Sequence, residues 1–385
     1  MENLTHSLVG LAAAKAGLER LSPGATALCI LAANAPDADV VTTYWGRWVY
    51  LHHHRGITHS IVGALCLAIL LPLLFYGVEK IMALARGRPS RFKLKGLLIA
   101  SLLVTATHPL LDWTNNYGVR PFLPWSGRWY YGDLVFIVDP WLWLVLGGAC
   151  FMLTARGWLR TGFWTLLALA LTLAIVLLPL RPNGPAIPVW VRVAWVVGVI
   201  AFITARLMHL DRRWGSRVAV AALCFVLVYW GGLWLIHARA YGEAMRLAGD
   251  FSAGRNDSVK RLAAMPSLAD PTLWRCVAET ERGATFLFNL DLNGNAEPLR
   301  NVILYERPSG EEAVAAAQAT RDERARVFLE FARFPVVETR GDCLTETFVQ
   351  FADLRYTEPV RGARGTFALE VPVECPPEVG ERLEK

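Results

Sequence analysis

The stretch Leu51-His52-His53-His54-Arg55-Gly56-Ile57-Thr58-His59-Ser60 leads directly into a long apolar run. Six of the eight histidines lie in the first third of the chain, at positions 6, 52, 53, 54, 59 and 108. The same third carries Asp37, Asp39 and Asp112 at the ends of apolar segments, where an ionisable side chain is costly and marks a functional site. The sequence therefore predicts a metal site at one face of a membrane.

The composition divides the chain into two parts. It has 385 residues, of which 54% are hydrophobic, and its fifteen tryptophans and positive mean hydropathy do not suit an ordinary soluble protein. The apolar residues concentrate before about Ala240. We therefore predict an all-α polytopic membrane domain over residues 1–239, with its core motifs in residues 1–140, and a small α+β soluble domain over residues 240–385.

Six apolar stretches are long enough for spanning helices. They are Ile61–Ala85, Leu94–Leu111, Leu134–Ala155, Thr161–Leu180, Val189–Leu207 and Val218–His237. Two shorter stretches, Leu4–Gly17 and Gly24–Ala35, are rich in Ala and Gly and suit helices buried among the others. The membrane domain is thus expected to have six to eight helices, with the lipid bilayer as its first partner.

Loop charge sets the expected orientation. Arg86–Lys95 carries five positive charges, Arg156–Arg160 two, and Arg206–Arg217 four against one aspartate. By alternation these loops share one side, which the positive-inside rule makes cytoplasmic. The histidine-rich segment and the C-terminal domain are then extracytoplasmic, and the net charge of +6 is explained without a nucleic-acid partner.

The C-terminal part shows alternating β-branched and aromatic residues, typical of strands. Gly310–Phe334 instead has helical periodicity, with Ala315, Ala319, Val327, Phe328 and Phe331 suited to one buried face. We interpret this domain as a folded cap or interaction domain with an unknown protein partner. In an oxidising compartment we expect a Cys343–Cys375 disulfide, with Cys276 as an alternative partner for either. The expected strands are Trp274–Thr280, Thr285–Leu292, Arg300–Glu306, Pro335–Arg340, Glu346–Phe351 and Phe367–Val373.

His108-Pro109-Leu110-Leu111-Asp112 places an imidazole and a carboxylate four positions apart, hence on one helix face. A divalent metal uses such a pair of nitrogen and oxygen donors. The spacing alone is a weak signal, because a single helical histidine is more often a hydrogen-bonded core residue. The other ionisable residues expected at the same membrane depth strengthen it.

The segment Asn34–Asp39 ends the second apolar stretch with two carboxylates, of which Asp37 is the stronger candidate ligand and Asp39 a weaker one. Three consecutive imidazoles point in different directions, so His52, His53 and His54 are not all expected to bind metal. Arg55 has the planar fork that suits an anion clamp. The alternative for this segment, a basic patch on anionic lipid, explains Arg55 but not the neighbouring acids and His59.

Two further aspartates, Asp133 and Asp139, stand before the next apolar stretch. They suit further metal ligands, a general base, or groups that orient ligand histidines. The tryptophans between Asp112 and Asp133 suit an interfacial aromatic belt.

Taken together, these motifs resemble the YdjM-like family of membrane-bound metal-dependent hydrolases. The resemblance rests on Thr5-His6-Ser7, Pro36–Asp39, His53–Ser60, His108–Trp113 and Asp139-Pro140, over roughly residues 1–155. That family is in turn distantly similar to zinc-dependent phospholipase C and the fungal single-strand nucleases. The sequence departs from those enzymes downstream, where only Asp133 and Asp139 replace their further ligands.

The resemblance implies a protein of the bacterial inner membrane that binds divalent metal ions. By analogy the metal is zinc, with two or more ions. The implied ligands are His6, Asp37, His53 or His54, His59, His108, Asp112 and Asp139. Asp39 or Asp133 would accept the proton, Arg55 would hold the phosphoryl group, and the substrate would be a lipid or membrane-associated phosphoester. The alternatives are an ion-coupled transporter and a non-enzymatic membrane scaffold with a structural metal.

Overall fold

The computed structural model describes residues 1–182, 184–294, 299–341, 347–359 and 367–373. These residues form two compact units that do not follow the order of the sequence. The first unit comprises Met1–Asp39, Arg55–Ile236 and Pro266–Pro271. The second comprises Val40–His54, His237–Met265 and the chain from Thr272 onward.

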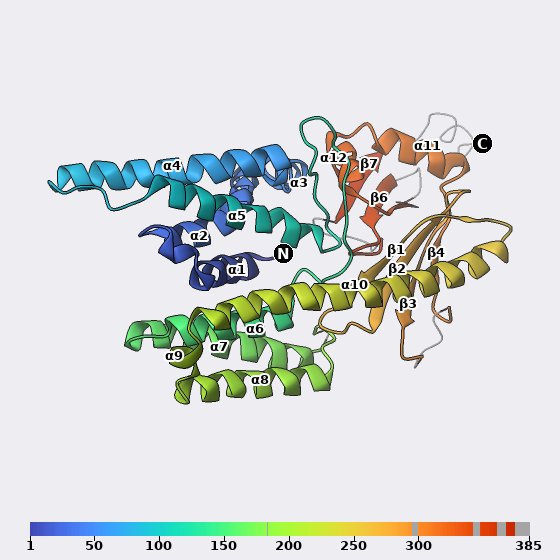
Figure 1. Ribbon diagram of the computed structural model, residues 1–385. Coiled ribbons are helices and arrows are strands. Elements are labelled where there is room, and N and C mark those ends of the chain that lie inside the picture. Colours follow the sequence, from blue (N-terminus) through green and yellow to red (C-terminus); the bar gives the residue numbers. More distant parts are fainter. Residues whose placement is uncertain (183, 295–298, 342–346, 360–366, 374–385) are drawn as a thin grey trace, which may run out of the picture. The chain divides into compact units, whose positions relative to one another are not determined.

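The first unit is helical (Figure 1). Helices α1, α2, α4 and α5 lie side by side, and α6 packs against α1 and α8. The helices are α1 Asn3–Ala16, α2 Ala25–Asn34, α4 Ile61–Ala85, α5 Leu94–Trp113, α6 Pro140–Thr154, α7 Trp158–Leu177, α8 Val189–Leu207, α9 Leu210–Trp214 and the first part of α10 Ser216–Ala253. Short 3-10 turns join several of them: η1 Leu18–Arg20, η2 Ala35–Trp45, η3 Ile57–His59 and η4 Leu178–Leu180.

Among the described residues, five helices are long and apolar enough to cross a membrane. They cover Ile61–Ala85, Leu94–Trp113, Trp158–Leu180, Val189–Leu207 and Ser216–Ala253, which confirms five of the six expected spans. The sixth is shorter than expected, because α6 begins only at Pro140, where Asp139 accepts hydrogen bonds from the Trp141 and Leu142 amides. Leu134 and Val135 are instead held outside the helix by hydrogen bonds from their amides to Thr114 O.

The two short N-terminal helices are packed closely through small residues. Ala14, Cys29, Ala33 and Ala100 belong to one buried cluster. A Cβ atom at Gly10 would lie 2.6 Å from Cys29 O, so only glycine permits this approach of α1 to α2. The tight contact fixes the helix ends that carry the candidate site residues.

The described residues of the second unit form two antiparallel sheets, the second part of α10 and three further helices. The sheet order is β1-β2-β3-β4 and β5-β6-β7, with Trp274 opposite Leu290 in the first and Val349 opposite Val371 in the second. Ala263, Val277 and Leu287 share a buried core with Val336 and Ala352. The strands are β1 Val259–Pro266, β2 Leu273–Thr280, β3 Thr285–Asp291, β4 Ile303–Tyr305, β5 Pro335–Arg340, β6 Thr347–Asp353 and β7 Ala368–Val373.

The helical N-terminal part and the following part with strands and helices confirm the predicted fold class, although individual elements differ. Strand β1 was not predicted, and β4 is shorter than the expected Arg300–Glu306. The expected helix over Gly310–Phe334 is two helices, α11 Gly310–Ala319 and α12 Glu323–Phe331, because Asp322 caps the start of the second by accepting from the Arg324 amide. Cys276 is buried in β2, while Cys343 and Cys375 lie outside the described residues, so their pairing stays a prediction.

One segment of the second unit comes from the N-terminal third of the sequence. Val40–His54 includes helix α3, Arg47–His53, which packs on α12. Trp48 on α3 contacts the apolar cluster that contains Phe328 and Phe351. The histidine run 52–54 therefore belongs with the β-rich part, although Arg55 returns to the first unit.

Candidate metal centre

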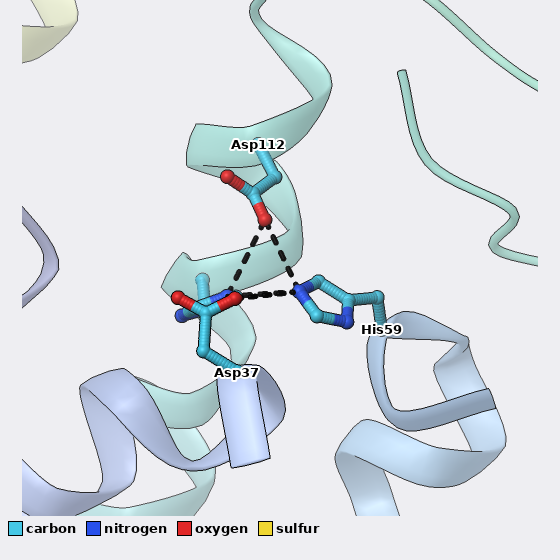
Figure 2. Close-up of side chains that lie close together, drawn as sticks. Asp37, His59 and Asp112 are labelled. Carbon is cyan, nitrogen blue, oxygen red and sulfur yellow. Dashed lines mark hydrogen bonds and ion pairs between the residues drawn. The ribbon is translucent and has the colours of Figure 1, made fainter. Parts of the chain in front are cut away.

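Four side chains from three segments of the first unit point toward one another. Asp37 lies on η2, directly after α2, and His59 lies on η3, directly before α4. His108 and Asp112 are one turn apart on α5, as their spacing predicts. Figure 2 shows Asp37, His59 and Asp112 converging from these separate elements.

Five of the six distances between the four ligating atoms are between 3.1 and 3.5 Å, and all six are within 4.8 Å. Asp112 Oδ2 lies 3.2 Å from His59 Nε2 and 3.3 Å from His108 Nε2. Asp37 Oδ1 lies 3.3 Å and 3.5 Å from the same two nitrogens, which are themselves 3.1 Å apart. The side chains of His59, His108 and Asp112 are at most 1% exposed, whereas Asp37 is 13% exposed. The cluster therefore opens to its surroundings on the Asp37 side.

This spacing fits a divalent cation. Four ligands on a tetrahedral ion with bonds of about 2.0–2.1 Å lie about 3.3 Å from one another. Two imidazole nitrogens and two carboxylate oxygens are a donor set that zinc and neighbouring transition metals accept. Asp112 Oδ2 faces the Nε2 atoms of both histidines, as a carboxylate ligand beside two imidazole ligands would.

The other ring nitrogen of each histidine is held by the protein. His108 Nδ1 lies 2.6 Å from Ala33 O and must donate to it, which leaves Nε2 as an electron-pair donor. His59 Nδ1 lies 3.0 Å from Thr58 Oγ1 and 3.3 Å from Asp39 Oδ2. Such outer contacts fix the tautomer and the orientation of ligand histidines in metal sites.

The Arg55 side chain is buried next to Asp112 and does not lie at the surface of the site. Its Nη2 lies 2.9 Å from Asp112 Oδ1, and its Nη1 donates to Asn115 Oδ1 at 3.0 Å. The guanidinium also lies over the Tyr117 ring, 4.6 Å from the centroid, and the residue is buried. Its contacts suit the orientation of Asp112, while the predicted contact with a phosphoryl group stays a hypothesis.

His6 is a fifth member of this neighbourhood. Its ring stacks on that of His108 with centroids 3.8 Å apart, and its Nε2 lies 3.5 Å from Asp112 Oδ1. Neither ring nitrogen makes a hydrogen bond within the described residues, although the side chain is fully buried. A buried unsatisfied imidazole is costly, so its position suits a further ligand.

The electrostatics of the cluster favour a bound cation. Burial disfavours a charge on His59, but hydrogen bonds to Asp112, Asp37 and Asp39 outweigh it and raise the pKa of His59 to about 10. Burial likewise disfavours the Asp37 carboxylate, yet hydrogen bonds from His108 and His59 lower the pKa of Asp37. The carboxylates therefore stay ionised, and they stabilise a positive charge on His59.

The other predicted site residues lie outside this group of four. Asp39 accepts from the Arg55 amide at 2.9 Å and lies beside His59 Nδ1. Asp133 lies in the turn held against the end of α5, where the Gly132 amide donates to Trp113 O. Asp139 caps α6 and accepts from Tyr229 Oη at 2.9 Å. His53 and His54 are assigned to the second unit, so the site roles of all five residues stay predictions.

Sequence reasoning missed the residues that hold the site in place. Asn115 accepts from both Arg55 Nη1 and the Tyr117 amide. The amino group of Met1 contacts Asp112, and the Ala33 carbonyl fixes His108. A polar residue one turn after Asp112 was a usable signal for Asn115, but a backbone carbonyl leaves no signal in the sequence.

The N-terminal part of the chain is similar to known proteins. Residues 1–183 match the family model described as "YdjM inner membrane protein". The chain is also 27% identical over 154 residues to the "Uncharacterized protein YfhP" of Bacillus subtilis (strain 168), which covers 37% of this chain and 43% of that protein. No solved structure matches the chain, and the more distant similarity to phospholipase C and the nucleases stays a hypothesis. The resemblance predicted from the histidine and aspartate motifs is thus confirmed over residues 1–183, which are similar to the YdjM inner membrane protein family.

Proposed function

We propose that this protein is a membrane-embedded, metal-dependent hydrolase that acts on a phosphoester of a lipid or another membrane-associated substrate. The proposal rests on four ligand atoms, three of them from buried side chains, that converge at the ends of two candidate spans. His59 is two residues before α4, and His108 and Asp112 lie in the last turns of α5.

The location of the cluster supports a substrate at the membrane surface. The opposite ends of α4 and α5 are joined by the loop that contains Arg86–Lys95, with its five positive charges. The cluster is therefore at the other end of this helical hairpin. If the basic loop is cytoplasmic, as the positive-inside rule predicts, the site faces the extracytoplasmic side.

Asp37, His59, His108 and Asp112 would hold the metal, with His6 beside them for a further contact or a second ion. Bound there, an ion such as Zn²⁺ would supply the Lewis acidity that activates water near neutral pH and polarises a phosphoester. His108 is kept in the required tautomer by Ala33 O, and His59 by Thr58 and Asp39. Arg55 neutralises and aligns Asp112. Since Asp37 is the most exposed of the four, substrate is expected to approach from its side.

The first experiment compares metal content with phosphodiesterase activity. Purified protein in uncharged detergent is supplied with Zn²⁺ and tested on phosphatidylglycerol and on a soluble aryl phosphodiester. We expect the parent and His52→Ala, whose side chain is outside the cluster, to hydrolyse one of them, and His108→Ala to lose both metal and activity. A parent protein that binds no metal, or equal hydrolysis by His108→Ala, would contradict the proposal. Bound metal with no hydrolysis would favour the scaffold.

The orientation needs its own test. Reporter fusions after Arg91 and Arg213 should report a cytoplasmic location, and a fusion after Lys385 an extracytoplasmic one, because of the loop charges. A cytoplasmic C-terminus would place the site on the other side of the membrane.

A further inference from the structure

The second unit contains a cavity of about 430 Å³ where α3 meets the start of α12. The cationic and aromatic side chains that line it are Trp45, Arg47, Trp48, His52, His53 and Arg324. Most of them come from the segment Val40–His54, which contributes none of Asp37, His59, His108 and Asp112. The cavity therefore offers a role for His52 and His53, which have no role in the proposed hydrolase.

The cavity walls are held in place by packing and by polar contacts. Trp48 contacts the apolar cluster around Phe328 on α12. His52 Nδ1 lies 3.6 Å from Oε2 of Glu330 on the same helix. The Arg47 guanidinium lies over the Trp48 ring, 4.3 Å from the centroid. These contacts orient the side chains before any ligand arrives.

The lining side chains carry a net positive charge, although Asp322 and Glu330 beside them pair with Arg324 and His52. Arg47 and Arg324 line it together with one carboxylate, that of Glu323, and the two histidines add further N–H donors. Asp322 accepts from Nε and Nη2 of Arg324 and leaves Nη1 without a hydrogen bond within the described residues. Burial and the nearby charge of Arg324 lower the pKa of Arg47, as expected for two guanidinium groups that face a common space.

We propose that this cavity binds a phosphate group, with Arg47 and Arg324 as its charged donors and the exposed Trp45 at its edge. Guanidinium groups bind phosphate through paired charge-assisted hydrogen bonds. Trp45 is 67% exposed and suits contact with the apolar or sugar-like remainder of such a ligand. A cavity of this size accepts more than bare phosphate, so the group comes from a phospholipid head group or from a soluble phosphoester.

A bound ligand would also act on the metal centre through the chain. The segment Val40–His54 starts directly after Asp39 and ends directly before Arg55, and the Arg55 amide donates to Asp39 Oδ2 at 2.9 Å. A ligand in the cavity would thus fix the segment whose two ends form part of the site. The phosphate site itself does not depend on the proposed hydrolase activity.

The test measures binding to the full chain in uncharged detergent by titration calorimetry. The probes are inorganic phosphate, dihexanoyl phosphatidylglycerol and, as an uncharged control, dihexanoylglycerol. We expect both phosphates to bind and the uncharged lipid not to bind. Tighter binding of the lipid than of phosphate would identify a head group as the source, and equal binding a soluble phosphoester.

Matched variants locate the binding. Arg47→Gln with Arg324→Gln should weaken phosphate binding about 100-fold, roughly tenfold for each lost charged donor, while Arg326→Gln on the same helix should not change it. Glu323→Gln should tighten binding about threefold by removing an opposing charge, a gain that misfolding cannot produce. Unchanged phosphate binding in His108→Ala would separate this cavity from the metal centre. A parent that binds neither phosphate, or equal binding by the double variant, would overturn the inference.

Discussion

Two groups of histidines lie close in the sequence and differ in almost every physical respect. His52 and His53 are exposed on α3, and His52 faces the single carboxylate of Glu330. His59, seven positions later, is fully buried among three aspartates. A run of histidines is therefore a weaker sign of a metal site than one histidine that is buried beside carboxylates and has its second ring nitrogen fixed.

The largest effect is expected when a histidine of the buried cluster is removed. His59→Ala and His108→Ala should each lower the affinity for Zn²⁺ more than about 100-fold, because each removes a direct ligand. His52→Ala and His53→Ala should leave it unchanged. Competition with a chromophoric chelator measures all four. Equal losses in the exposed and buried variants would remove the distinction between the two groups.

A second variant tests the charge that holds the buried group together. Arg55→Gln should lower metal affinity by about 10–100-fold, since Asp112 then loses a buried partner at 2.9 Å. Arg128→Gln, an exposed arginine near Tyr130, serves as the control. If Arg55→Gln keeps full metal affinity and loses only activity, Arg55 acts on the substrate, as the sequence alone predicts.

A third test concerns the backbone under His59. A Cβ atom at Gly63 would lie 1.8 Å from Ile57 O, so Gly63→Ala must displace the turn that carries His59. We expect a loss of about 1–3 kcal/mol of stability and weaker metal binding. Gly77→Ala in the same helix meets no atom within 4 Å and should be neutral. Thermal unfolding in detergent, with and without Zn²⁺, compares the two, and equal unfolding temperatures would show that this turn is not tightly held.

The smallest effect is expected at Asp139. Its carboxylate is occupied by the Trp141 and Leu142 amides and by Tyr229, so Tyr229→Phe should cost about 1 kcal/mol of stability and leave metal content unchanged. Asp139→Asn should also retain the metal. Metal loss in Asp139→Asn, measured by elemental analysis, would restore this residue to the ligand set predicted from the sequence.

Much of the first unit could be predicted because its signals are local. Apolar length identified the spans, and the spacing of His108 and Asp112 placed both on one face of α5. The short α6 was not predicted, because residues 134–138 are apolar and continue the hydrophobic run, whereas hydrogen bonds to Thr114 O and the Asp139 cap make the helix begin at Pro140.

Two features of the second unit had no such local signal in the sequence. Strand β1, Val259–Pro266, lacks a regular alternation and is buried over its last five residues, so it did not resemble the other strands. The place of Val40–His54 in this unit rests on Trp48 and its contacts with residues nearly 300 positions away. No property of the segment itself predicts that pairing.

We propose that two imidazoles and two carboxylates hold one metal ion at the end of α5. X-ray absorption spectroscopy of the purified, zinc-loaded full chain tests it most directly. We predict nitrogen and oxygen ligands at about 2.0 Å, no sulfur, a multiple-scattering pattern from two imidazoles, and its loss in the double variant His59→Ala, His108→Ala. A sulfur ligand, or a spectrum that is the same in the double variant and the parent, would contradict the claim.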